Sequence, residues 1–307
     1  KDNAIQHEEF GMYWKSYVSG YRWYEAPIET QAVMIELFDE VANDQESVEN
    51  LKIWLLKQKQ TTNWKTTKQT TEAVYALLLK GTDLLASDEL VEITIGGQAI
   101  NYTKTVDDNP YNVNTQAGTG YFKTNWTGEN VKPEMGNVTV KKNTTGVAWG
   151  ALYWQYFEDL DKITFAETNL KLEKQLYKLT NTSEGETLTQ INDNNTLKVG
   201  DKVRIRIELR TDRNLEYVHI KDMRASGFEP INVLSSYKYR EGLGYYEATK
   251  DASTNFFFDY IPKGTYVFEY DLRVQHKGQF SNGIATIQCM YAPEFTSHSD
   301  GIRVVVE

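Results

Sequence analysis

The strongest constraint on the fold is the regular alternation of apolar and polar side chains between residues 266 and 275. A period of two is typical of a half-buried antiparallel strand. Turns are expected before it at residues 262–264, Pro-Lys-Gly, and after it at residues 277–278. Residues 284–291 are expected to form the next strand, ended by Pro293 because proline lacks a ladder donor. One face of the first strand is predicted to carry Tyr266, Phe268, Tyr270, Leu272 and Val274, and the other Val267, Glu269, Asp271, Arg273 and Gln275.

The last third of the chain contains about eight strand-like segments in about 110 residues, which is the spacing of one complete β-sandwich. We place this domain at residues 171–307. Its polar stretch at 181–200 is expected to lie in loops between strands. The segments are VRIRIELRT, EYVHIKDM, FEPINVL, YYEAT, TNFFFDY, TYVFEYDLRV, GIATIQCMY and IRVVVE.

Residues 1–87 are predicted to be helical, with a short helical start in the first 24 residues. The first long helix is expected at 28–41 after Pro27, and Asn43 with Glu46 is expected to cap the second. Threonines at the start of TTKQTTEA offer caps for the third, which Gly81 is expected to end. The helices have more apolar surface than two neighbours can cover, which indicates part of an α/α toroid. Residues predicted to be buried are Val48, Leu51, Trp54, Leu55, Ala73, Val74, Leu77 and Leu78.

Between these parts, residues 88–170 read as a smaller β domain. VEITIGG, YFKTNWT, NVTVKKNTT and VAWGALYWQYF are strand-like, and Gly96-Gly97 is expected to form a tight hairpin turn. The strand count is that of about half a sandwich. The predicted fold class is therefore multi-domain, with partial α/α toroid helices followed by two antiparallel β-sandwich domains.

The composition excludes several classes of partner. A net charge of −10 and a pI near 5.1 disfavour a nucleic-acid partner. The sequence has no polybasic patch that would bind a membrane surface. No apolar run approaches the roughly 18 residues that span a bilayer, so no membrane insertion is expected. Lys1 is not an initiator residue, and the chain is interpreted as a mature or engineered fragment with export or anchoring signals outside it.

No catalytic, cofactor-binding or metal-binding residue is predicted. The histidines at 7, 219, 276 and 298 have no ligand spacing, and nucleophile-elbow, P-loop and dinucleotide motifs are missing from the sequence. The single cysteine, Cys289, is expected to be a core residue on a strand, because neither a histidine nor a helix N-terminus is visible beside it. The carboxylate pairs at 8–9 and 39–40 are interpreted as solvated faces. The chain is therefore not expected to be an enzyme.

Three groups of segments together resemble the C-terminal third of bacterial alpha-2-macroglobulin-like proteins. WYEAPIETQAVMIELFDEV, LKIWLLKQKQ and NWKTTKQTTEAVYALL are similar to the last helices of the family's thioester domain, an α/α toroid. The block at 88–168, ending VAWGALYWQYFEDLDKI, resembles the second half of a CUB-like sandwich into which that toroid is inserted. FEPINVLSSY, DYIPKGTYVFEYDLRV and a strand ending MYAPEF resemble the terminal macroglobulin-type, or receptor-binding-type, sandwich.

The resemblance implies a fragment of an endopeptidase inhibitor that traps proteases through the full-length protein. In the family, a C-x-E-Q thioester couples to the protease; this chain has no such motif, so the thioester either lies upstream or is missing from this member. Met290 and Tyr291 match a Met-Tyr pair that shields the thioester in bacterial relatives, which implies an intramolecular contact with the thioester domain. The alternative is that Tyr291 only caps the end of the sandwich. The resemblance also implies a periplasmic or cell-surface location, with a lipid anchor through an N-terminal region outside this sequence.

A second hypothesis is an extracellular carbohydrate- or peptide-binding module. Tryptophan rings can serve as sugar platforms, although large aromatic residues more often pack in cores and between domains. A glycan array would distinguish the two hypotheses. The tryptophans concerned are Trp14, Trp23, Trp64, Trp126, Trp149 and Trp154.

Overall fold

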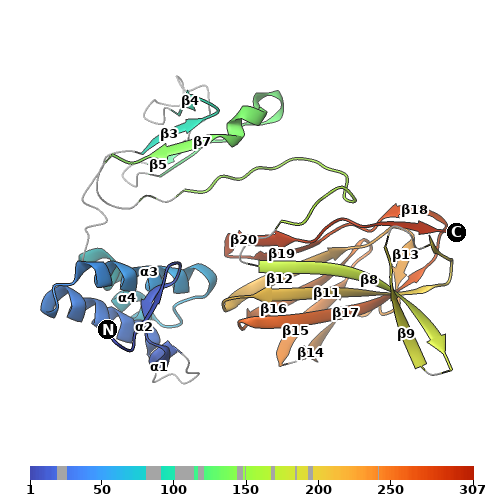
Figure 1. The fold of residues 1–307 in the computed structure, drawn as a ribbon, viewed down its shortest axis with the longest axis horizontal. Helices are drawn as coiled ribbons and strands as arrows, with labels where there is room; N and C mark the ends of the chain where they lie inside the picture. The colour runs from blue at the N-terminus through green and yellow to red at the C-terminus, as the bar shows by residue number, and fades with distance from the viewer. Residues whose placement is uncertain are drawn as a thin grey trace. The chain divides into compact units, whose positions relative to one another are not determined.

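The computed structural model describes the chain except for residues 19–25, 81–90, 101–113, 117–120, 144–147, 149, 167–169, 184, 193–195 and 241. The chain divides into two compact units, residues 1–55 with 66–152 and residues 56–65 with 153–307. Figure 1 draws the helices in blue, the small sheets in green and the large sheets in yellow to red. No described helix is long and apolar enough to cross a membrane.

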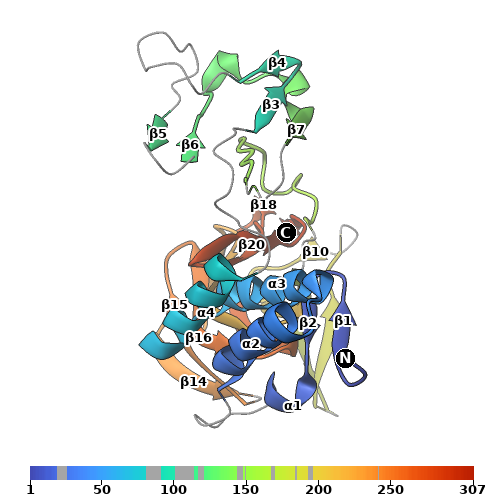
Figure 2. The ribbon, with the colours of Figure 1, turned by 90° about the vertical axis from the view of Figure 1, so that its left-hand side faces the viewer.

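The N-terminal part begins with a β-hairpin, so the helical start expected there is wrong for residues 5–13. Gly11 provides a φ of +70° at the point where the hairpin approaches the backbone of Asn50, a conformation and a space that favour glycine. Figure 2 shows the helices that follow the hairpin, with α2 beside α4. The elements are β1 (Ile5–His7), β2 (Gly11–Tyr13), α1 (Lys15–Val18), α2 (Pro27–Glu36), the π-helical turn η2 (Leu37–Val41), α3 (Gln45–Thr61) and α4 (Thr67–Leu79).

The three long helices form where their periodicity predicted them. Pro27 occupies the first helical position of α2. The cap of α3 is Asp44 rather than Asn43: the Asp44 carboxylate accepts hydrogen bonds from the Ser47 amide at 3.2 Å and the Ser47 hydroxyl at 2.9 Å. At α4, the predicted threonine cap is confirmed by the bond from the amide of Gln69 to the hydroxyl of Thr66. The expected stop at Gly81 lies outside the described residues.

The helices bury one stripe and leave another apolar stripe open. Val74 and Leu78, which were predicted to be buried, are 41% and 40% exposed. They point away from the covered stripe because α4 turns only part of its circumference toward its described neighbours. Val33, Leu37, Val41 and Tyr75 are also exposed, whereas the buried residues are Ile28, Ala32, Ile35, Val48, Leu51, Trp54, Leu55, Ala73, Ala76 and Leu77. An uncovered apolar stripe is what part of an α/α toroid would have, but the described helices do not form a toroid themselves, so the toroid interpretation stays a prediction.

The middle of the chain forms two small sheets. One has the order β4-β3-β7 and the other pairs β5 with β6. Gly96 and Gly97 have φ values of +59° and +79°, so the predicted tight turn between β3 and β4 is confirmed. The bounds are β3 (Glu92–Ile95), β4 (Gln98–Ala99), β5 (Asn114–Gln116), β6 (Tyr121–Lys123), the 3₁₀ turns η4 (Gly128–Asn130) and η5 (Pro133–Gly136), and β7 (Val138–Lys141).

The aromatic segment VAWGALYWQYF is not a strand at its described residues, 148 and 150–157, although its pattern predicted one. Its backbone has no strand partner, and Leu152, Tyr153, Trp154, Tyr156 and Phe157 are all exposed. β-propensity requires a neighbouring strand and a surface to cover, and the described residues provide neither here. The described part of this block is thus two small sheets and an unpaired segment.

The C-terminal part is a sandwich of two antiparallel sheets, as predicted (Figure 1). The sheets have the orders β13-β17-β11-β8-β9 and β14-β15-β16-β12-β19-β20, and a small third sheet has the order β10-β21-β18. The strands are β8 (Leu170–Thr182), β9 (Gly185–Gln190), β10 (Thr196–Leu197), β11 (Lys202–Thr211), β12 (Leu215–Met223), β13 (Phe228–Pro230), β14 (Ser236–Arg240), β15 (Leu243–Thr249), β16 (Ser253–Ile261), β17 (Gly264–Val274), β18 (Gly278–Ser281), β19 (Ala285–Cys289), β20 (Ala292–His298) and β21 (Arg303–Val306).

The alternation along β17 determines which face enters the core. Phe268 and Leu272 are buried, and they lie opposite Ile207 and Val203 of β11 in the register. On the outer face the opposed residues are charged: Arg204 lies opposite Asp271, and their side chains pair at 2.7 Å. Arg206 pairs in the same way with Glu269 at 2.7 Å. Cross-strand ion pairs therefore occupy the positions that the alternation left polar.

Two predictions about this domain need correction. Pro293 does not end a strand but lies within β20, which is tolerated because β20 is an edge strand. The strand before it, β19, ends earlier, at Cys289. The polar stretch after residue 181 is not all loop, because GETLTQ forms β9 and pairs with the exposed end of β8. Here β8 extends far enough to provide the neighbouring strand that the threonine-rich segment requires.

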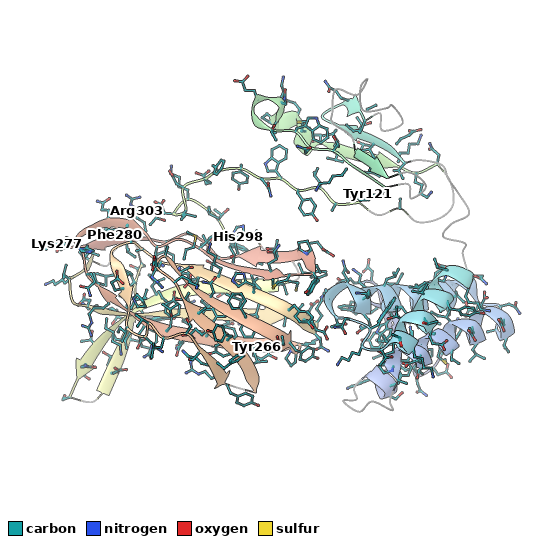
Figure 3. The ribbon with its side chains drawn as sticks, turned by 180° about the vertical axis from the view of Figure 1, so that it is seen from behind. Tyr121, Tyr266, Lys277, Phe280, His298 and Arg303 are labelled. Carbon is teal, nitrogen blue, oxygen red and sulfur yellow. The ribbon has the colours of Figure 1, made fainter. Side chains whose placement is uncertain are left out.

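Residues 159–166 run along the sandwich and are attached to its C-terminal strands. The amide of Gly301 donates to the carbonyl of Ile163 at 2.8 Å, and the hydroxyl of Ser297 donates to the carbonyl of Ala166 at 2.6 Å. Arg303, labelled in Figure 3, forms an ion pair with Asp161 at 2.7 Å. We call residues 159–166 the strap.

Candidate functional site

The candidate site is the hairpin turn between β19 and β20. Cys289 and Ala292 are paired across the ladder, so Met290 and Tyr291 form a two-residue turn between them. The amide of Met290 donates to the carbonyl of Tyr217 on the adjacent strand β12 at 2.9 Å. A register shift at Gln288–Cys289 marks an irregularity next to the turn. The turn is thereby fastened to the sheet on both sides.

Both side chains of the turn are in solvent. Met290 is 60% exposed and Tyr291 is 81% exposed. The ring of Tyr291 meets the ring of Tyr217 edge-on, with centroids 5.1 Å apart and planes at 87°. Tyr291 is therefore not a core residue, and its role, either an interdomain contact or a cap on the end of the sandwich, stays a prediction. The pair directly follows β19, whereas the expected strand at 284–291 included it, and two further strands, β20 and β21, follow in the chain.

Tyr217 is the residue that sequence reasoning missed. Its φ of +53° is unusual for a bulky side chain, and a backbone strain of this kind costs about 1–3 kcal/mol. The strained backbone carries the carbonyl that holds Met290, and the ring is 42% exposed beside Tyr291. No signal in the sequence could have identified Tyr217, because left-handed backbone conformations are typical of glycine and asparagine and not of tyrosine.

Cys289, directly before the turn, is a core residue, as predicted. It is buried among the sandwich residues, and burial raises the pKa of its thiol to about 11. This environment is that of a small apolar core residue.

The four histidines do not come together. His219 stacks on Phe257 at 4.6 Å and contacts Asn255, whereas the ring nitrogen of His7 accepts two local amide hydrogen bonds. Within the part of the chain that the structure describes, no group of three potential ligands could hold a metal ion.

The tryptophans pack mainly with their local neighbours. Trp14 contacts the rings of Tyr17 and Phe38, and Trp126 packs against a small core around Ile95. Trp154 is exposed in the unpaired segment, and Trp23 and Trp149 lie outside the described residues.

A buried charge cluster lies inside the sandwich and joins its two sheets. The ammonium of Lys174 on β8 lies 2.6 Å from the carboxylate of Asp222 on β12. It also donates to the carbonyls of Met223 at 2.6 Å and Asn282 at 3.3 Å. The phenol of Tyr270 donates to the other Asp222 oxygen at 2.6 Å. Burial raises the pKa of Asp222, and the neighbouring Lys174 opposes this shift.

Comparison with known proteins identifies the sandwich. Residues 170–294 match the family model described as Bacterial Alpha-2-macroglobulin MG10 domain. The sandwich belongs to the bacterial alpha-2-macroglobulin family. The resemblance of the terminal sandwich stated from the sequence is thus confirmed, and the match covers the strands from β8 to β19 and the Met290–Tyr291 turn of this MG10 domain.

Solved structures of bacterial alpha-2-macroglobulins are similar over most of the chain. The Salmonella alpha-2-macroglobulin mutant Y1175G is 13% identical, with a TM-score of 0.37, over 94% of this chain and 18% of that one. Escherichia coli alpha-2-macroglobulin activated by porcine elastase is 12% identical, with a TM-score of 0.43, over 92% and 24%. A native E. coli fragment from domain MG7 to the C-terminus is 12% identical, with a TM-score of 0.37, over 92% and 42%. This chain therefore spans less than half the length of each.

A curated relative is also similar over a shorter stretch. Circularly permutated Ras protein 2 of Dictyostelium discoideum is 22% identical over 110 residues, which are 36% of this chain and 3% of that protein.

Proposed function

We propose that this chain is the non-catalytic C-terminal part of a bacterial protease-trapping protein, in which the Met290–Tyr291 turn docks on a neighbouring domain. The assignment of the sandwich as an MG10 domain supports this role. As the resemblance implies, proteases are the partners of the full-length protein, and the protein acts in the periplasm or at the cell surface. The helices of residues 1–79 are then the end of the thioester-type domain.

The exposure of Met290 and Tyr291 carries the proposal. An apolar pair at the tip of a fastened turn gains free energy when a partner surface removes it from water. Methionine and tyrosine are also enriched in protein interfaces. Tyr217 contacts the ring of Tyr291 and holds the backbone amide of Met290, so docking requires little ordering of the turn backbone.

The proposed occupant is the thioester-type domain of the same protein. This chain has no C-x-E-Q motif, so the proposal places the reactive acyl group in a part of the protein outside these residues. A docked methionine and tyrosine would exclude water from that group, which is an electrophile that water destroys. The role of the pair is therefore to prolong the lifetime of the acyl group before a protease arrives.

The double change Met290→Ala/Tyr291→Ala in the full-length protein is expected to shorten the lifetime of the acyl group in water. Thermal stability should change little, because exposed side chains away from special features contribute within about 0.5 kcal/mol. Thiol release with time measures the first effect, and thermal unfolding of the isolated chain measures the second. Tyr239→Ala, at a tyrosine of the same sandwich that is 80% exposed, is the matched control.

A normal acyl lifetime in the double variant would contradict the docking role. A large fall in melting temperature would instead indicate that the two side chains stabilise the core of the sandwich. If the full-length protein releases no thiol at all, the shielding role is void, and docking is then tested by the accessibility of Tyr291 in the full-length protein.

The remaining apolar surface of this chain supports its being part of a larger protein. The helices expose an apolar stripe that includes Val41 and Val74, and the unpaired segment exposes Tyr153, Tyr156 and Phe157. Large exposed apolar patches indicate interaction sites. We infer that further toroid helices cover the stripe. We also infer that residues 88–170 are one half of a CUB-like domain and that strands of its other half pair with the unpaired segment.

This inference predicts that the isolated chain binds more hydrophobic dye than its share of the full-length protein. The dye fluorescence of the two proteins, compared per mole under the same conditions, measures the difference. Equal fluorescence would mean that nothing upstream covers these surfaces.

A further inference from the structure

A second surface lies at the other end of the six-stranded sheet, on the edge strand β14. This strand ends the order of its sheet, so one side of its backbone has no strand partner among the described residues. An open edge is a template for another extended chain. The edge is also apolar, because Ile231, Val233, Leu234, Tyr237 and Tyr239 are all exposed at or just before β14.

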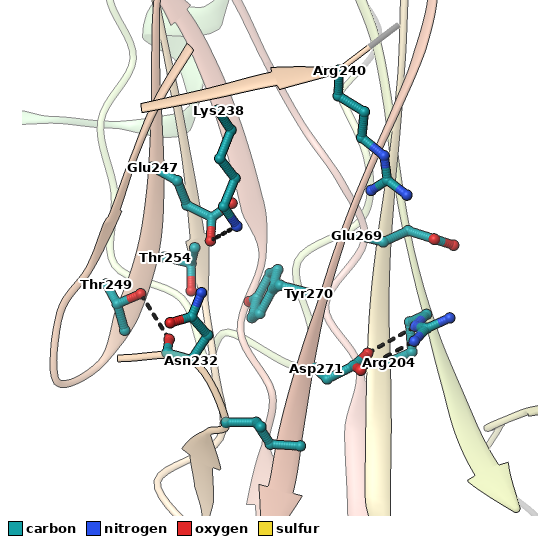
Figure 4. A pocket seen from close by; sticks show the side chains of 11 residues that line it. Arg204, Asn232, Lys238, Arg240, Glu247, Thr249, Thr254, Glu269, Tyr270 and Asp271 are labelled. Atoms are coloured by element: carbon teal, nitrogen blue, oxygen red, sulfur yellow. Dashed lines mark hydrogen bonds and ion pairs between the residues drawn. The ribbon is translucent and has the colours of Figure 1, made fainter. Parts of the chain in front are cut away.

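A polar cavity of about 250 Å³ lies beside the same strand. Side chains alternate along β14, so Lys238 and Arg240 turn toward the cavity, while Tyr237 and Tyr239 turn the other way. Figure 4 shows Lys238 and Arg240 extending into the space above Tyr270, Glu247 and Glu269. The edge thus has an apolar side and a charged side.

Three cations, Arg204, Lys238 and Arg240, and three carboxylates line the cavity, and Arg206 of β11 adds a further cation beside Glu269. Each carboxylate that lines it already has a cation: Glu247 pairs with Lys238 at 2.7 Å, Asp271 with Arg204 at 2.7 Å, and Glu269 with an arginine of β11 at 2.7 Å. The side chain of Arg240, unlike its backbone in the β14–β15 ladder, has no hydrogen bond or ion pair with the described residues. The cavity therefore offers a guanidinium that has no carboxylate partner among the described residues, and a carboxylate is a strong partner for such a group.

We propose that β14 binds an extended acidic peptide by strand addition. The peptide backbone would pair with the open edge, and a peptide strand alternates its side chains with the same period as β14. An acidic side chain would then enter the cavity against Arg240, and its apolar neighbours would lie beside Tyr237 and Tyr239. This site is independent of the Met290–Tyr291 turn, because β14 and β20 are at opposite ends of the sheet order.

The test uses the 307-residue chain and two labelled, capped peptides. One alternates valine with glutamate, and the other alternates valine with lysine. Fluorescence anisotropy measures affinity, and amide chemical shifts locate the binding. The glutamate peptide is expected to bind at least tenfold more tightly than the lysine peptide and to shift the amide signals of β14. Arg240→Glu is expected to reverse the preference.

Arg210→Glu is the matched control, because Arg210 is an exposed arginine of the same sandwich that does not line the cavity. It should leave the preference for the glutamate peptide unchanged. Thermal unfolding of the Arg240→Glu protein confirms that it is folded. Equal binding of the two peptides, or shifts confined to other strands, would overturn the proposal. Shifts of β14 amides on concentrating the protein alone would overturn it as well, because a second copy of the chain would then be the occupant.

Discussion

Replacing Lys174 with methionine is expected to lower the free energy of unfolding by about 3–5 kcal/mol, because Asp222 would be left charged and unpaired inside the sandwich. Both side chains are completely buried, so water cannot replace the lost partner. Chemical denaturation monitored by tyrosine and tryptophan fluorescence measures the change. A loss of this size removes a large part of the stability of an ordinary domain.

The double variant Lys174→Met/Asp222→Leu distinguishes a lost ion pair from lost packing. It removes both charges together, so it should be more stable than the two single changes would give by addition, with a coupling of about 0.5–3 kcal/mol. Arg206→Met is the surface control: its ion pair with Glu269 is partly exposed and is worth at most about 1 kcal/mol. A Lys174→Met protein as stable as the parent would show that Asp222 becomes protonated and remains neutral without its partner.

Replacing Gly11 with alanine is expected to cost more than about 3 kcal/mol or to displace the N-terminal hairpin. Two effects add: the φ of +70° is unfavourable for alanine, and the new Cβ would lie 2.1 Å from the carbonyl oxygen of Asn50. That oxygen belongs to the backbone of α3, which cannot move aside as a flexible side chain could.

Gly97→Ala separates the two effects. Gly97 has a similar φ, +79°, but no atom lies within 4 Å of the position of an added Cβ. Only the backbone term remains there, and the expected cost is about 1 kcal/mol. Thermal unfolding of both variants, followed by circular dichroism in the helical band, measures the difference. Equal losses would mean that the hairpin does not pack closely against α3.

The elements that could be predicted are those in which one local rule dominates. The alternation of β17 and the helical periods of α2 to α4 reflect burial of one face, and that pattern is visible in the sequence. The elements that were missed depend on contacts distant in the sequence. Residues 5–13 form a hairpin in which Gly11 lies against α3. GETLTQ forms a strand because β8 extends beside it.

The candidate site follows the same division. Met290 and Tyr291 could be located because they follow a strand, but their exposure depends on where β19 ends, and Pro293 was a misleading guide to that point. Tyr217 could not be found, since its role arises from a strained backbone and from a neighbour more than 70 positions away. The buried Lys174–Asp222 pair was equally hidden, because lysine and aspartate on a strand ordinarily indicate its solvent face. The domain boundaries at 87/88 and 170/171 stay predictions.

The strap defines where a protease can cut the chain before the sandwich. Residues 150–157 are extended, unpaired and rich in exposed aromatic side chains, whereas residues 159–166 are held to the sandwich by hydrogen bonds and an ion pair. A chymotrypsin-like enzyme would therefore find its preferred residues on the unprotected side and stop at the start of the strap. The cut would release the MG10 domain with its strap still attached and all its strands intact. The released domain would therefore stay folded and resist further degradation.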